Sequence, residues 1–134
     1  MSNKLAFDFT YPFPPVPASR PRVTQRGTFT PKRYADYKKA LTLALFKEFG
    51  FWAWDIPPVG SKERSKWLKA NRYGLQVDAF LDKDTGDWDN YGKAVSDALE
   101  QAGIIANDKQ IDTATVNKSI DRKNPRLEIR LWKL

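Results

Sequence analysis

Apolar residues follow two different periods along this chain of 134 residues. At 4–11 and 74–82 they alternate with polar or small residues, which is the pattern of a half-buried β-strand. Two further strands are predicted at 111–120 and 126–134, on either side of the turn-forming cluster DRKNP at 121–125. Together these four strands are enough for a small β-sheet.

Two helices are predicted between the strands. Apolar residues recur at helical spacing over 31–49, with Thr30 as N-cap and Pro31 in the first turn, and again over 90–102. The resulting order, β-α-β-α-β-β, favours an α/β (α+β) fold in which a small mixed sheet carries two main helices. The length is that of one ordinary domain, so we expect a single domain over 1–134.

Two segments lack a regular period. Residues 19–33 are polar and basic and predict a loop or a loose hairpin. Residues 51–73 contain Pro57 and Pro58 and predict a long connection with a short helical turn near 61–70.

The composition narrows the possible chemistry. The chain has no cysteine and no histidine, which excludes disulfides, thiolate and imidazole metal ligands, and His-based triads. Catalysis would have to use carboxylates, Lys, Arg, hydroxyls or a hard metal ion.

The net charge of +7 indicates a polyanionic partner, and nucleic acid is favoured over a membrane because no basic amphipathic anchor helix stands out. Neither a membrane-length apolar run nor a secretory signal layout is present, so we expect a cytoplasmic protein.

The stretch TGDWDNYGK at 85–93 concentrates charged residues where a strand gives way to a helix. Asp87 and Asp89 are two residues apart, so in an extended conformation both carboxylates point the same way. Asp108 lies in the loop after the helix, and a turn of the chain would bring it back to them. Three ionised carboxylates at close range need a counter-ion, and Mg²⁺ or Mn²⁺ is the natural cation for oxygen ligands.

The same residues also have a plainer interpretation. Asp and Asn are favoured N-cap residues, so DWDN can be a helix cap and Asp108 a polar loop residue. Lys93 lies four residues after Asp89 on the same helix face, where it can steady a phosphate or the acids, or form an ordinary surface pair. Asp97, one turn further, is a salt-bridge partner for Lys93. Spacing alone leaves both interpretations open.

The stretch at 87–111 resembles the signature of the RusA family of Holliday junction resolvases. Its sequence is DWDNYGKAVSDALEQAGIIANDKQI. That pattern runs D-x-D-N-x-x-K, then D-A-L, a glycine, and an aspartate shortly before Q-I or Q-V. The stretch at 12–41 also resembles the amino-terminal part of the phage and prophage branch. The chain departs from the family pattern at Trp88, Gly92 and Asn107, where an aliphatic residue, a less flexible residue and an acid are usual.

The resemblance implies a RusA-like fold and a metal-dependent, structure-specific endonuclease that acts on branched DNA as a homodimer. Such an enzyme resolves four-way (Holliday) junctions by paired symmetric nicks in DNA recombination and repair. The metal-binding aspartates carry over to Asp87, Asp89 and Asp108, with Mg²⁺ as cofactor and Mn²⁺ as a substitute. The catalytic lysine carries over to Lys93, and Asn90 is assigned a capping or supporting role.

Two other functions stay open. The chain can be a non-catalytic module that binds branched or single-stranded DNA, with its acids serving as caps. It can also be a nuclease that cuts flaps or RNA.

The basic segment has a predicted role in binding DNA. Five of its residues are assigned to phosphate contacts: Arg20, Arg22, Arg26, Lys32 and Arg33. Phe29 and Tyr34 lie close enough in the sequence to stack at an opened junction centre, and a solvated basic loop is the alternative. The aromatic cluster at 51–54 and Trp67 is assigned to core or dimer contacts.

Overall fold

The computed structural model describes residues 6–19, 22–29, 31–50 and 56–134, and for residues 6, 22–24, 28 and 29 it describes the backbone only. The elements in chain order are β1 (Ala6–Tyr11), β2 (Arg22–Thr24), β3 (Gly27–Phe29), α1 (Lys32–Phe49), α2 (Lys62–Ala70), β4 (Tyr73–Leu81), α3 (Trp88–Gln101), the 3-10 turn η2 (Asp108–Gln110), β5 (Ile111–Ile120) and β6 (Arg126–Lys133).

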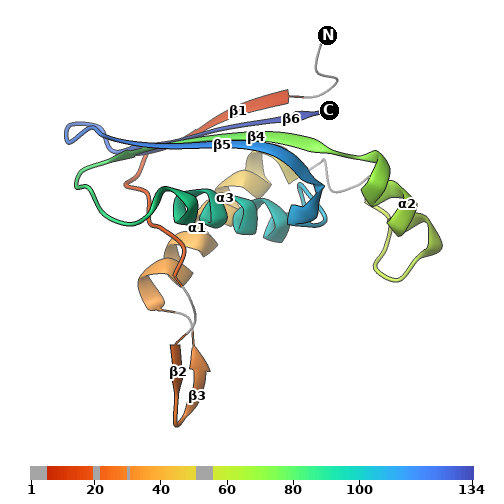
Figure 1. Cartoon of the computed structure of the whole chain (residues 1–134), viewed down its shortest axis with the longest axis horizontal. Coiled ribbons are helices and arrows are strands. Elements are labelled where there is room, and N and C mark those ends of the chain that lie inside the picture. Colours follow the sequence, from red (N-terminus) through yellow and green to blue (C-terminus); the bar gives the residue numbers. More distant parts are fainter. Residues whose placement is uncertain (1–5, 20–21, 30, 51–55) are drawn as a thin grey trace.

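Four strands form a mixed sheet in the order β1-β6-β4-β5. Strands β4 and β5 are parallel and are joined through α3, whereas β6 runs antiparallel to both β1 and β4. Both α1 and α3 lie against one face of this sheet (Figure 1). The predicted small mixed sheet with two main helices is therefore confirmed.

The core lies between this sheet face and the two helices. The alternation predicted for β4 is confirmed, because its inward residues Leu75, Val77, Ala79 and Leu81 are at most 2% exposed. Burying a leucine or valine side chain contributes on the order of 1.5–3 kcal/mol. This core fixes α3 against β4 and β5, so it also fixes the residues that α3 carries.

The ends of the helices differ from the predictions. Helix α1 begins at Lys32 with Pro31 at the cap position, while Thr30, the predicted cap, lies outside the described residues. Helix α3 begins at Trp88, and its cap position is Asp87. The prediction that Asn90 caps this helix is therefore wrong.

The hairpin that was one of two alternatives for 19–33 is confirmed, and the helical turn predicted within 51–73 is longer than expected. Residues 22–29 form the hairpin β2–β3, and the short helical turn predicted near 61–70 is the nine-residue helix α2. Neither extends the four-stranded sheet. Within the described ranges, no helix is both long enough and apolar enough to cross a bilayer.

Candidate active site

The start of α3 holds the first two aspartates in different backbone conformations. Asp87 is extended, with φ −85° and ψ 146°, whereas Asp89 already belongs to the first helical turn. The prediction that both leave one extended segment in the same direction is therefore wrong. Carboxylates at a helix N-terminus are stabilised by the macrodipole, so both positions tolerate a negative charge.

After α3 the chain reverses direction, which brings Asp108 back to the helix. Gly103 has a φ of 75°, a conformation that favours glycine, and its N–H donates to the Glu100 carbonyl at 3.0 Å. As a result, Asp108 Oδ2 lies 3.6 Å from Lys93 Nζ, across 15 positions of sequence. The return of the chain on which the predicted site depends does occur.

Lys93 lies between two carboxylates. Its Nζ is 2.9 Å from Asp97 Oδ1 and 3.6 Å from Asp108 Oδ2. The hydrogen bond to Asp97 and the negative charges of both acids raise the pKa of Lys93, against a smaller opposing effect of partial burial. The predicted salt bridge between Lys93 and Asp97 is confirmed. The lysine therefore carries a positive charge at neutral pH, and it is about half exposed.

Asp89 and Asp108 line the same cavity, which has a volume of about 260 Å³ and lies between α3 and β5. Its walls also include Gly92 and Ser96 of α3 and apolar residues of the sheet. Asp87 is not among the lining residues. The structure therefore places two of the three predicted metal ligands at one cavity.

The donor set suits a hard cation by its chemistry, because every candidate ligand is a carboxylate. Within the described part of the chain, however, no three Asp or Glu side chains are grouped closely enough to hold a metal ion. Lys93 provides a positive charge next to the Asp108 carboxylate. The assignment of Asp87, Asp89 and Asp108 as metal ligands stays a prediction.

Glu100 was missed by the sequence analysis. It lies three residues after Asp97, so it continues the charged face of α3. Partial burial and the charges of Asp108 and Asp97 raise its pKa, and Lys93 lowers it to a lesser extent. Its helical spacing from Asp97 is the signal that would have found it.

Tyr34 connects α1 to the charged cluster formed by Lys93, Asp97, Glu100 and Asp108. It is only 3% exposed, and its hydroxyl donates to Asp97 Oδ2 at 2.9 Å. Burial and the neighbouring carboxylate strongly raise the pKa of Tyr34. The prediction that Tyr34 stacks on DNA is therefore wrong. Its hydroxyl instead binds Asp97 Oδ2, while Lys93 contacts the other carboxylate oxygen, Oδ1.

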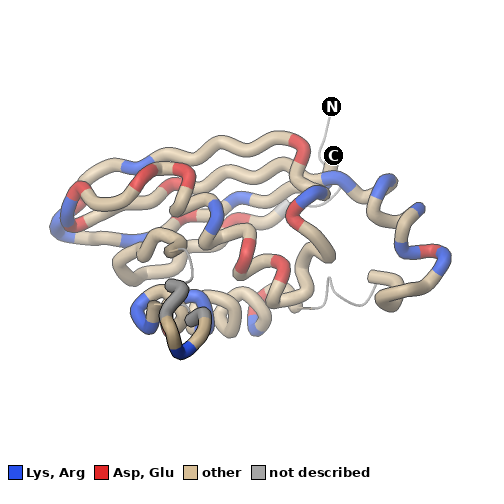
Figure 2. Tube along the Cα trace, turned by 60° about the horizontal axis from the view of Figure 1, so that its bottom comes forward, with Lys and Arg blue, Asp and Glu red and all other residues tan. Residues whose placement is uncertain are grey.

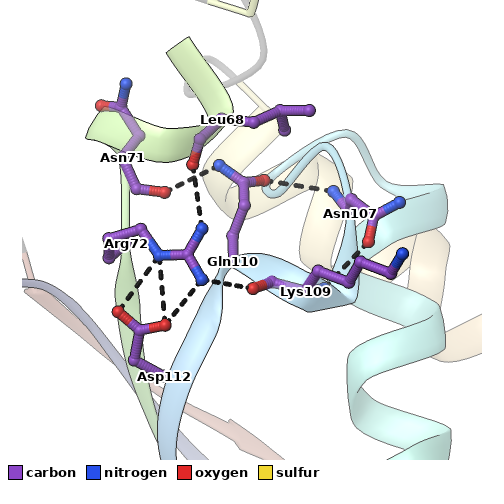
Figure 3. Close-up of polar contacts among 7 residues, drawn as sticks. All are labelled: Leu68, Asn71, Arg72, Asn107, Lys109, Gln110 and Asp112. Atoms are coloured by element: carbon purple, nitrogen blue, oxygen red, sulfur yellow. Dashed lines mark hydrogen bonds and ion pairs between the residues drawn. The ribbon is translucent and has the colours of Figure 1, made fainter. Parts of the chain in front are cut away.

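A buried glutamine holds the turn that carries Asp108 (Figure 3). Gln110 is 1% exposed, and its Oε1 accepts from the N–H groups of Ala106 at 2.8 Å and Asn107 at 3.1 Å. Its Nε2 donates to the Asn71 carbonyl at 2.8 Å. Gln110 and Asn107 together form a capping box around η2, so Asn107 has a structural role in this turn.

Arg72 makes a second connection to the same turn (Figure 3). Its guanidinium donates to both carboxylate oxygens of Asp112, and also to the carbonyls of Leu68 and Lys109. The hydrogen bond to Arg72 lowers the pKa of Asp112. Two side chains therefore fix the turn to the segment between α2 and β4. Gln110 extends from the turn to Asn71, and Arg72 extends from the segment to the turn.

The N-terminal segment reaches the start of α3 before it enters the basic hairpin. The Ala18 N–H donates to the Asn90 carbonyl at 2.9 Å. Gly86 lies so close to this segment that an added Cβ would meet Pro17 Cγ at 2.9 Å. These contacts join the segment before the basic hairpin to the start of α3.

The predicted DNA-binding residues lie on this hairpin and at the start of α1. Arg26 and Arg33 are exposed, and Lys32 is exposed and paired with Asp36 at 3.1 Å. Arg20 lies outside the described residues, and only the backbone of Arg22 is described. Their predicted contacts with phosphate stay predictions.

The family model of endodeoxyribonuclease RusA matches residues 51–132, more than half of the chain. The chain belongs to the RusA endodeoxyribonuclease family. This family consists of hydrolases that cut phosphodiester bonds within DNA, and the resemblance drawn from 87–111 is confirmed.

The RusA match includes the four residues predicted to act in catalysis: Asp87, Asp89, Lys93 and Asp108. It begins after the basic hairpin, so it says nothing of Arg20–Arg33. No curated protein matches the chain.

Proposed function

We propose that residues 1–134 form one RusA-type domain that resolves four-way DNA junctions by paired, symmetric, metal-dependent nicks. The observation that carries this proposal is the cluster on α3 and η2, in which Lys93 pairs with Asp108 beside a cavity that Asp108 shares with Asp89. Membership of an endodeoxyribonuclease family supports DNA as the substrate, and the net charge of +7 agrees with a polyanionic ligand.

In this proposal Asp87, Asp89 and Asp108 hold Mg²⁺, for which Mn²⁺ can substitute. When bound, the ion supplies Lewis-acid activation of water and stabilisation of the leaving 3′ oxygen. The exposed position of Asp89 and Asp108 leaves their carboxylate oxygens accessible to a cation that arrives with the DNA.

Lys93 has an electrostatic role. Asp97 holds its Nζ at 2.9 Å, whereas the contact with Asp108 is longer, at 3.6 Å. The ammonium can therefore turn from Asp108 towards a phosphate while Asp97 keeps it in place. A positioned cation offsets the negative charge that grows on the scissile phosphate as it becomes pentacovalent.

The paired nicks call for two active sites. A homodimer supplies them, because a two-fold axis in the protein matches the approximate two-fold symmetry of two opposed cuts in a junction. The products would carry 5′ phosphates and be ligatable. In this proposal the protein acts in DNA recombination and repair, in the cytoplasm.

A panel of labelled substrates tests the proposal. Four-way junction, flap, linear duplex, single strand and RNA are each incubated with the protein in Mg²⁺ or in EDTA. We expect paired nicks in the four-way junction in Mg²⁺ alone, and resealing of those nicks by DNA ligase. Equal cutting of flaps or RNA would contradict junction specificity. Junction binding without cutting in any metal would indicate the non-catalytic DNA-binding module instead.

A further inference from the structure

Helix α2 carries a row of basic residues outside the active site. Lys62, Lys66 and Lys69 are four and three residues apart, so their side chains lie on one face of the helix. All three are exposed. In the described part of the chain none of them forms an ion pair or a side-chain hydrogen bond, which leaves three positive charges without a protein partner.

The opposite side of α2 faces the protein. Trp67 and Leu68 are partly buried, and Arg64 Nη1 donates to the Pro57 carbonyl at 2.9 Å. The helix has no fully buried residue, and it projects from the end of the sheet where β4 begins (Figure 1). Figure 2 shows basic residues along this projection with little acid among them. The lysine face therefore points away from the protein.

The end of α2 is fixed to the turn that carries Asp108. Arg72, just beyond the helix, donates to the carbonyls of Leu68 and Lys109, and Gln110 donates to the Asn71 carbonyl at 2.8 Å (Figure 3). DNA held on α2 would thus have a defined position relative to the active site.

We propose that the lysine face of α2, formed by Lys62, Lys66 and Lys69, binds the phosphate backbone of one double-stranded arm of the branched DNA substrate. The inference rests on the proposed function, because it presumes a substrate with duplex arms. From Lys62 to Lys69 the helix rises roughly 10 Å. The phosphates of one strand rise about 3.4 Å per nucleotide along the duplex axis, so the row of lysines covers about three nucleotide steps of one strand.

The salt dependence of binding tests this proposal. The variant Lys62→Gln/Lys66→Gln/Lys69→Gln is compared with a control that removes the same charge elsewhere, Lys47→Gln/Arg122→Gln/Lys123→Gln. All three control residues are exposed. Binding of an intact four-way junction is measured in EDTA over a range of salt concentrations.

Each phosphate contact contributes about 0.9 to the slope of log K against log salt. We expect the slope to fall by about 2 to 3 in the α2 variant and by less than about 1 in the control. Equal changes in both variants would mean that net charge alone matters, and an unchanged slope in the α2 variant would mean that its lysines touch no phosphate. Either result would overturn the proposal.

A mapping experiment identifies the contacted DNA. Because the chain has no cysteine, Ser65→Cys offers one attachment point for a reagent that cuts DNA nearby. Ser65 is exposed and lies three residues after Lys62 and four before Lys69. Ser119→Cys, exposed on β5, serves as the control.

We expect the reagent at Ser65 to cut the backbone of a duplex arm. Cutting confined to single-stranded DNA or to the junction centre would overturn the proposal, as would the same pattern from Ser119. The substrate panel with wild-type protein separates the two ideas. Junction nicking together with a failed α2 test removes only the role of α2, whereas no junction nicking removes the proposed function itself.

Discussion

Gln110→Met is the substitution that most directly tests how Asp108 is positioned. Methionine has nearly the length of glutamine but no amide, so it fills the same space without the hydrogen bonds. In the wild-type protein the Gln110 amide accepts from two backbone N–H groups, of Ala106 and Asn107, and donates to the carbonyl of Asn71. The side chain is 1% exposed, so water cannot easily replace these partners.

The expected loss of stability follows from the number of bonds. Three hydrogen bonds at about 1 kcal/mol each give a decrease of about 3 kcal/mol in the free energy of unfolding. Buried backbone groups left without partners would increase this loss, and movement of the turn towards water would reduce it. A domain of this size has about 5–15 kcal/mol in total, so the variant should still fold.

Urea denaturation measures the effect through the midpoint, with the slope m as a check on two-state unfolding. Lys109→Met is the matched control, because it places the same side chain at an exposed neighbour and should change stability by less than about 0.5 kcal/mol. Junction nicking is then measured at low temperature, where both variants are folded. Since Gln110 holds the residues just before Asp108, we expect nicking to slow by at least about tenfold. Wild-type stability, or wild-type nicking in a destabilised variant, would refute this reasoning.

Three further predictions concern the surroundings of the site. Tyr34→Phe removes the hydroxyl that binds α3 and should slow junction nicking about fivefold, the equivalent of about 1 kcal/mol, with unchanged junction affinity in EDTA; a loss of affinity instead would contradict a positioning role. Because Arg72 lowers the pKa of Asp112 from its usual 3.8, the pair stabilises the protein above that pH and loses its effect as the pH falls through the lowered pKa. Asp112→Asn should therefore destabilise the protein at pH 7 and lose this difference in strong acid, as followed by urea denaturation, and a pH-independent difference would refute the assignment. Gly92→Ala places a Cβ 2.7 Å from Val116 Cγ2 and should lower Tm although alanine favours helices by about 1 kcal/mol; Val116→Ala should restore it, and a raised Tm in the single variant would contradict this close approach.

The strands and main helices could be predicted because each buries one face, which imposes a regular period on the sequence. Strand β4 is the clearest case, with every second residue from Leu75 to Leu81 buried. Helix α2 has no buried residue, so its period is weak, and the sequence indicated only a short turn there.

The site could be predicted only in part. Family-like spacing selected Lys93 and Asp108, but their approach depends on the reversal at Gly103 and on Gln110. Tyr34 was assigned to DNA stacking, and its hydrogen bond to Asp97 was missed because the two residues are 63 positions apart. No local pattern records a hydrogen bond of that range.

Gly92 shows how a departure from the family pattern can have a physical reason. From the sequence alone, Gly92 could be described only as a more flexible residue than is usual at this position. In the structure α3 packs so closely on β5 at this point that a side chain would meet Val116. The same close packing forms one wall of the cavity shared by Asp89 and Asp108.

The variant Asp89→Asn tests most directly whether the aspartates act in cutting the DNA rather than in holding it. Wild type and variant are compared on one labelled four-way junction, for binding in EDTA and for nicking in Mg²⁺. We expect equal binding and a loss of nicking of at least about a hundredfold, since the substitution removes a charge and changes little in shape. Nicking at the wild-type rate by Asp89→Asn would contradict the assignment of this cluster as the active site.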